Sequence, residues 1–193
     1  MANKQSLELF TNKTGLCIVD VQEILAAAMP EKVSKGTLRN CLNLIEAARV
    51  FQLPIVVTEQ YSKALGRSLP VVAEAVLRLP SQQVFFFEKT QFACAGQRGF
   101  DSWVRKTARP QWILAGMETH VGVYQTARGM VDAGFEVHVP RDAVVSRTMA
   151  NWEIGLQLVN RCGAVVTSTE TVIFDLLKDA ANDEFALLSK LIK

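Results

Sequence analysis

The sequence is poor in histidine and has no excess of charge of either sign. It has two histidines, His120 and His138, in 193 residues. Zinc sites are built from several His or Cys ligands, so two histidines on different predicted elements argue against a catalytic metal. Lys and Arg number 21 against 19 Asp and Glu, which leaves a formal net charge of +2. This balance gives no reason to expect nucleic acid or a membrane surface as partner.

Cysteines and long apolar runs are also scarce. The four cysteines, at 17, 41, 94 and 162, form no CxxC pair, which argues against a metal finger. No stretch reaches the roughly 20 apolar residues that a membrane helix needs. Residues 1–10 are mixed and polar, without the apolar core of a secretory signal. We therefore expect a reduced, cytoplasmic protein, with an organelle-targeting role of its N-terminus left open.

Short apolar runs alternate with longer segments of helical periodicity. In the helical segments apolar residues recur every three or four positions, as in Leu38, Cys41, Leu42 and Ile45. Strands joined by helical crossovers imply a mainly parallel sheet covered on both faces. We predict a single domain over residues 1–193, an α/β/α sandwich of three layers around a six-stranded, mainly parallel, Rossmann-like sheet. The six predicted strands are 15–20, 54–58, 84–87, 112–115, 135–140 and 164–167.

Sheets of this kind bind ligands at the carboxyl ends of their strands, near a point where the strand order reverses. Asp20 ends the first predicted strand, where partial desolvation raises a carboxyl pKa and suits it to acid/base work. A helix cap or turn carboxylate is the structural alternative. Lys89 follows the third predicted strand and can face Asp20 or stabilise negative charge on a substrate. A solvated lysine is the alternative there.

Residues 116–122 run from the fourth predicted strand into a helix. A helix N-terminus offers unpaired backbone N–H groups that can bind an oxyanion. Glu118 and Thr119 fit a helix start and can be capping residues only. His120 can contact substrate or transfer a proton, and a structural role is equally compatible with its position. We assign His138, inside the fifth predicted strand, a structural role.

Five stretches in a fixed order resemble motifs of the isochorismatase-like hydrolase family, also called cysteine hydrolases. The resemblance covers roughly residues 14–175 and is closest to the isochorismatase-domain-containing branch. It implies the three-layer α/β/α fold predicted above. The stretches are Leu16–Gln22 (D-x-Q), Thr58–Gly66 (TEQYPKGLG), Lys89–Phe92 (K-T-x-F), Gly116–Ala127 (G-x-E-T-H-V-C-V-x-Q-T-A) and Phe135–Val144 (Y-E-V-H-V-x-x-D-A-V).

The resemblance implies a catalytic triad of Asp, Lys and Cys, of which only two members are present. The Asp corresponds to Asp20 and the Lys to Lys89, but the Cys position is Gly122. Glycine has no nucleophile, so a thioester intermediate at this position is excluded. Cys94, five residues after Lys89, is too displaced to replace it. True isochorismatases resemble the chain in having glycine here, and they hydrolyse a vinyl ether, whereas the residues around Gly122 resemble the amidase-like branch.

The resemblance also implies the substrate contacts and one feature of the backbone. Members of the family commonly have a non-proline cis peptide before this helix, here Met117–Glu118. Metal-binding relatives have an Asp and two His near the second strand, where this sequence has Glu59-Gln60-Tyr61, so we expect neither metal nor cofactor. The expected substrate contacts are Gln22, Tyr61, Phe92, Met117, Glu118 and His120.

These observations predict a hydrolase of a small molecule that uses non-covalent acid/base chemistry through Asp20 and Lys89. The alternative is a catalytically inactive binding or scaffold protein with the isochorismatase fold. A redox protein acting through its cysteines is a third and weaker possibility. We expect a homo-oligomer from the resemblance and from the frequency of symmetric assemblies. The apolar segment 185–192 can dock on its own sheet or on a partner.

Overall fold

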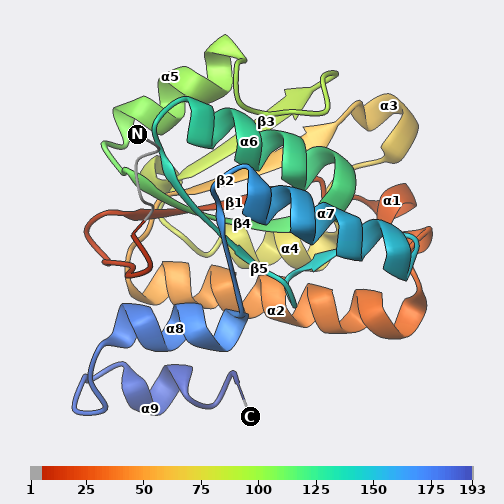
Figure 1. The fold of residues 1–193 in the computed structure, drawn as a ribbon. Coiled ribbons are helices and arrows are strands. Elements are labelled where there is room, and N and C mark those ends of the chain that lie inside the picture. Colours follow the sequence, from red (N-terminus) through yellow and green to blue (C-terminus); the bar gives the residue numbers. More distant parts are fainter. Residues whose placement is uncertain (1–5, 193) are drawn as a thin grey trace.

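A parallel sheet forms the centre of the structure, a computed structural model that describes residues 6–192 (Figure 1). The strand order is β3-β2-β1-β4-β5-β7, and β6 pairs with β4 beside this path. All of these named strands pair in parallel. The strands are β1 (Thr14–Val19), β2 (Ile55–Gln60), β3 (Val84–Lys89), β4 (Gln111–Met117), β5 (Glu136–Pro140), β6 (Val144–Val145) and β7 (Val165–Thr167).

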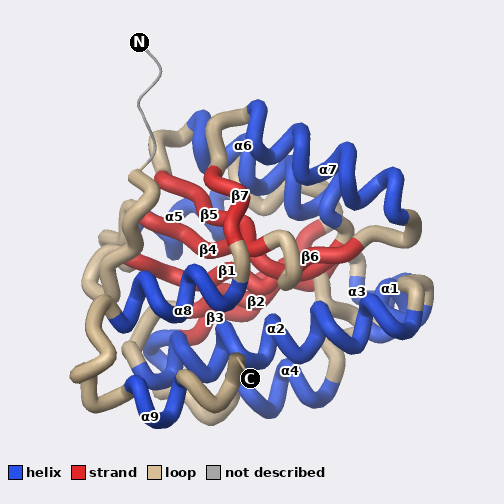
Figure 2. Tube along the Cα trace, turned by 60° about the horizontal axis from the view of Figure 1, so that its bottom comes forward, coloured by secondary structure: helices blue, strands red, loops and turns tan. Residues whose placement is uncertain are grey.

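Helices cover both faces of the sheet (Figures 1 and 2). One face packs against α2, α4 and α8, and the other against α5, α6 and α7. No helix among residues 6–192 is long and apolar enough to cross a membrane. The helices are α1 (Glu23–Ala27), α2 (Glu31–Val50), α3 (Ser62–Leu65), α4 (Pro70–Val76), α5 (Arg98–Lys106), α6 (Tyr124–Asp132), α7 (Met149–Arg161), α8 (Thr169–Leu177) and α9 (Phe185–Leu188), with the 3-10 helix η1 (Ser81–Gln83) and the π-helical segment η2 (Thr119–Val123).

Side chains of the central strand β1 alternate between the two cores. Leu16 and Ile18 pack in the core under α2, whereas Cys17 and Val19 pack in the core under α6. This follows from the period of two of a β-strand, because both faces of a covered sheet must be apolar. All six residues of β1 are buried. The continuous apolar run in the sequence is therefore the mark of a strand buried on both faces.

The predicted three-layer architecture with a mainly parallel sheet is confirmed, but the predicted number of strands is wrong. Within residues 6–192 the sheet has seven strands and not six. The additional strand is β6, which has only two residues and pairs Val145 with Met117 at the end of β4. Two residues show no periodicity in a sequence, so this strand has no recognisable pattern. His138 is buried in β5, as a structural histidine should be, and burial lowers its pKa.

The order of the strands creates a point where the chain changes direction across the sheet. From β1 the chain adds β2 and then β3 on one side, and it returns to place β4 on the other side of β1. The connections that leave β1 and β4 run in opposite directions across the sheet, which opens a crevice at the carboxyl ends of these two strands. Asp20 follows β1 there, and Met117 ends β4. Residues from four adjacent strands therefore meet at this edge of the sheet.

Candidate active site

Asp20 and Lys89 form a buried ion pair at the carboxyl ends of β1 and β3. Lys89 Nζ donates a hydrogen bond to Asp20 Oδ2 at 2.6 Å, and the side chains are 0% and 5% exposed. The intervening strand β2 supplies a partner for each member. Thr58 Oγ1 donates to Asp20 Oδ1 at 2.6 Å, and Gln60 Oε1 accepts from Lys89 Nζ at 2.9 Å. The structure thus brings together the two residues that the sequence singled out.

Burial controls the acidity of the Asp20 carboxyl group. It raises the pKa of Asp20, and the nearby Lys89 ammonium and Thr58 hydroxyl only partly oppose this effect. Asp20 also has a left-handed backbone conformation, with φ of 51°, which Asp tolerates better than most residues. A carboxyl group with a raised pKa exchanges its proton closer to neutral pH than a solvated one. Asp20 can therefore act as an acid or a base.

Gly122 lies directly beside Asp20, in η2 between β4 and α6. A Cβ atom at this glycine would be 3.2 Å from Asp20 Oδ2 and 3.3 Å from the Met117 carbonyl oxygen. We call the space bounded by these two oxygens the Gly122 notch. A cysteine here would hold its sulfur next to the carboxylate, as the family triad requires. The predicted cis peptide between Met117 and Glu118, which precedes η2, is confirmed.

A small cavity, which we call the inner cavity, opens at Asp20 and Gly122. Its volume is about 90 Å³, the space of roughly three water molecules. Its walls are mostly apolar, and three polar side chains reach it. The lining residues are Asp20, Leu25, Gln60, Leu65, Phe92, Met117, Glu118, Val121 and Gly122.

Three of the six expected substrate contacts, Phe92, Met117 and Glu118, line the inner cavity, and the other three do not. Gln22 is fully buried, and its amide binds backbone groups at the end of β2 and in the turn after α3. One of these groups is the backbone N–H of Gln60, at 2.7 Å from Gln22 Oε1. The position of Gln22 therefore suits a structural role, in which its side chain holds Gln60 in place.

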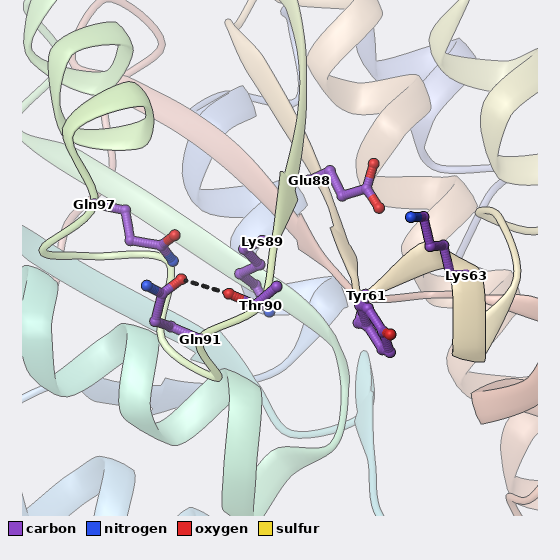
Figure 3. Close-up of a pocket in the computed structure, with 7 residues that line it drawn as sticks. All are labelled: Tyr61, Lys63, Glu88, Lys89, Thr90, Gln91 and Gln97. Carbon is purple, nitrogen blue, oxygen red and sulfur yellow. Dashed lines mark hydrogen bonds between the residues drawn. The ribbon is translucent and has the colours of Figure 1, made fainter.

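Tyr61 lines a second, more open space of about 400 Å³, which we call the outer cavity (Figure 3). Tyr61 is 50% exposed, and the two cavities have no lining residue in common. His120 lines neither cavity, and its Nδ1 lies 3.0 Å from Ser146 Oγ. The residues around the outer cavity are Tyr61, Lys63, Glu88, Lys89, Thr90, Gln91 and Gln97.

The structure also gives roles to three residues to which the sequence assigned none. Thr58 and Gln60 bind the ion pair, and Arg147 binds Glu118. Thr58 and Gln60 both lie in the stretch Thr58–Gly66, which resembles a family motif, so this motif could have pointed to them. Gly155 lies inside α7, and a Cβ there would be 2.7 Å from the His120 backbone nitrogen. A glycine in the middle of a helix often marks such a close approach.

Other reactive groups lie outside the site. Cys94 is fully buried and lines neither cavity, which agrees with its exclusion as a displaced nucleophile. Within residues 6–192, no group of three His, Cys, Asp or Glu side chains is placed to hold a metal ion. That the protein needs no metal or cofactor stays a prediction.

A carboxyl–ammonium pair lies beside the turn from β4 into the following helix, at the switch point of a parallel sheet. This arrangement identifies an α/β/α protein whose candidate site lies at the strand ends. The Isochorismatase domain matches residues 14–171, and the chain belongs to this family.

Three relatives show how far the similarity extends. The chain is 35% identical to the secreted isochorismatase effector Isc1 of Phytophthora sojae, over 100% of this chain and 90% of the relative. It is 30% identical to the structure of the MAR1 ribonuclease of Caenorhabditis elegans, with a TM-score of 0.87 over 96% and 92% of the two chains. The Escherichia coli YcaC product, described as an octameric hydrolase of unknown specificity, shares the fold with a TM-score of 0.86 and 23% identity, over 98% and 91% of the chains.

Lys89→Met tests the coupling of the buried pair. We expect it to lower the free energy of unfolding by about 3–5 kcal/mol, because Asp20 would then be buried without its cation. The double variant Asp20→Asn/Lys89→Met should lose less than the sum of the two single variants. Urea denaturation measures all three. Lys35→Met is the matched control, since Lys35 pairs with Glu31 at 75% and 82% exposure, and such a pair contributes about 0–1 kcal/mol. Equal losses for Lys35→Met and Lys89→Met would contradict the prediction.

Gly155→Ala tests the close approach of α7 to η2. The added methyl group meets the His120 backbone, so we expect a lower melting temperature and weaker ligand binding at the inner cavity. Gly36→Ala in α2 is the control, because a Cβ at Gly36 has no neighbour within 4 Å. This change should stabilise the protein by about 0.5–1 kcal/mol through helix propensity alone. Stabilisation by both substitutions would rule out the proposed constraint.

Proposed function

We propose that the chain hydrolyses a small molecule by acid/base chemistry at Asp20, with Lys89 orienting the carboxyl group and no covalent enzyme intermediate. The observation that carries the proposal is the position of the Gly122 notch. Glycine leaves the space beside Asp20 free of a side chain, and Asp20, Met117 and Gly122 all line the inner cavity. A water molecule in this cavity, farther from the backbone than the Cβ position and in van der Waals contact with Gly122, can donate a hydrogen bond to the Asp20 carboxylate.

For a carbonyl substrate the water oxygen forms the new bond to carbon, and Asp20 accepts the proton that the water loses. The bond to the leaving group then breaks, and Asp20 returns the proton to that group. The raised pKa of Asp20 supports both transfers, because acid/base catalysis is most efficient when the pKa is near the working pH. Lys89 keeps Oδ2 in place and compensates the charge of the carboxylate.

For an activated vinyl ether the same carboxyl group acts first as an acid. Asp20 gives its proton to the enol carbon, and water adds to the resulting oxocarbenium ion and loses a proton to Asp20. The adduct then breaks its bond to the alcohol that leaves. Membership in the Isochorismatase family supports this class of reaction. The absence of a nucleophile at Gly122 does not affect it, since no step needs a thiol.

A catalytically inactive binding protein is the alternative. It is favoured by the missing side chain at position 122 of a site that otherwise keeps Asp20 and Lys89 in contact. Such a protein would bind ligands in the inner cavity and leave them unchanged. The experiments below separate it from an enzyme.

The assembly and location of the protein belong to the same proposal. We propose a homo-oligomer, supported by the Escherichia coli YcaC product, which has the same fold and is described as octameric. We also propose a cytoplasmic location.

Asp20→Asn tests the proton transfer. We expect kcat/KM to fall by about 10²–10⁴-fold on a panel of small vinyl ethers and amides that includes isochorismate. If Asp20 acts first as an acid, the wild-type rate should fall as the pH rises through its raised pKa, and if it acts as a base the rate should rise. Asp132→Asn, an exposed change in α6, is the control. Equal rates for wild type and Asp20→Asn would contradict the mechanism.

Two matched variants at position 122 extend this experiment. In Gly122→Ala the methyl group occupies the notch beside Asp20 and crowds the space that the water needs, so turnover should fall while the fold remains. In Gly122→Cys a thiol stands beside Asp20, so hydrolysis of amides through a thioester should appear. Full activity of Gly122→Ala would contradict the water site. A wild-type protein without turnover, together with an active Gly122→Cys variant, would favour the binding protein.

A further inference from the structure

Each carboxylate of the inner cavity is neutralised by a single cation. Lys89 pairs with Asp20. Arg147 pairs with Glu118, through its backbone N–H at 2.9 Å and its Nε at 3.1 and 3.2 Å from the carboxylate oxygens. No Lys or Arg is among the residues that line this cavity, all of which lie in the described part of the chain. The cavity therefore has no positive charge left over for an anionic ligand.

The side chains that reach the inner cavity offer few hydrogen-bond donors. Gln60 is the one lining residue with side-chain N–H groups, and one of the two N–H groups on its Nε2 donates to the Thr90 carbonyl at 2.6 Å. Its Oε1 already accepts from Lys89. Glu118 is 7% exposed and receives bonds from Arg147 alone, whereas a carboxylate has about four acceptor positions. Glu118 therefore offers unused acceptor capacity at the cavity wall.

We propose that Glu118 is a specificity-determining residue, which selects a ligand whose polar group carries N–H donors or a positive charge and rejects a carboxylate. This inference rests on the proposed function only because both of them use the inner cavity. A carboxylate in this space would face Glu118 and Asp20 without a free cation, and like charges side by side weaken binding strongly. The apolar walls formed by Leu25, Leu65 and Phe92 fit the carbon skeleton of such a ligand.

Three probes of equal size test the selectivity. Butyramide, butyramidine and butyrate share a carbon chain and differ in carrying a neutral, a cationic or an anionic head group. Titration of the ¹⁵N-labelled full chain, followed by the backbone amide signals of residues 117–123, gives their dissociation constants. We expect butyramide and butyramidine to bind at least about tenfold more tightly than butyrate, a difference well within the effect of one opposed charge.

Two substitutions test whether the charge selectivity depends on the pair of Glu118 and Arg147. Glu118→Gln keeps the size of the side chain and leaves Arg147 without its carboxylate, so the preference for butyramidine over butyrate should fall about tenfold or more. Arg147→Gln should raise the same preference, and it tests the proposal independently if Glu118→Gln fails to fold. A merely structural role would weaken all three probes alike. Butyrate binding as tightly as butyramidine, an unchanged preference in the folded variants, or no binding of any probe to the wild type would overturn the proposal.

The test of the role of Glu118 can be distinguished from the test of the proposed function. Binding needs no turnover, so charge selectivity without hydrolysis of any substrate would overturn the function and leave the role of Glu118 in place. Efficient turnover of a dicarboxylate such as isochorismate, together with tight binding of butyrate, would overturn the role of Glu118 and support the function.

Discussion

The site depends on one interaction, the ion pair between Asp20 and Lys89. A buried carboxylate and a buried ammonium are each unfavourable alone, and each is stable here only because the other lies 2.6 Å away. The β2 strand between them completes the pair by giving a hydroxyl to one and an amide oxygen to the other. Three adjacent strands of a parallel sheet thus build the buried ion pair, and the fourth brings Gly122 against it.

The parallel order of the strands explains why the sequence could locate this centre. Apolar runs mark the strands, and a residue directly after such a run lies at the carboxyl edge of the sheet. Asp20 and Lys89 both follow from this rule. The contact between them does not, because strand order depends on crossovers and not on local pattern. The family-like motifs supplied the missing step, since they placed Gly122 and the cis peptide in the same centre.

Other parts of the structure could not be predicted, for physical reasons. The two-residue strand β6 has too few residues for a periodic pattern. Gln22 and Tyr61 were expected at the substrate because they lie in motifs, yet the direction of a side chain depends on packing. Gln22 is turned to backbone groups of β2 and of the turn after α3, and Tyr61 to the outer cavity. Glu118 pairs with Arg147, which lies 29 residues further along the chain. No local sequence pattern spans this separation.

Lys89 is the last residue of β3, which is an end strand of the sheet order in the described chain. Outer strands open more readily than central ones, because they have hydrogen-bonded neighbours on one side only. Each transient detachment of β3 would carry the ammonium away and leave Asp20 isolated in an apolar environment. The fraction of molecules with an intact Asp20–Lys89 pair is then governed by fraying at the sheet margin, well before the molecule as a whole unfolds.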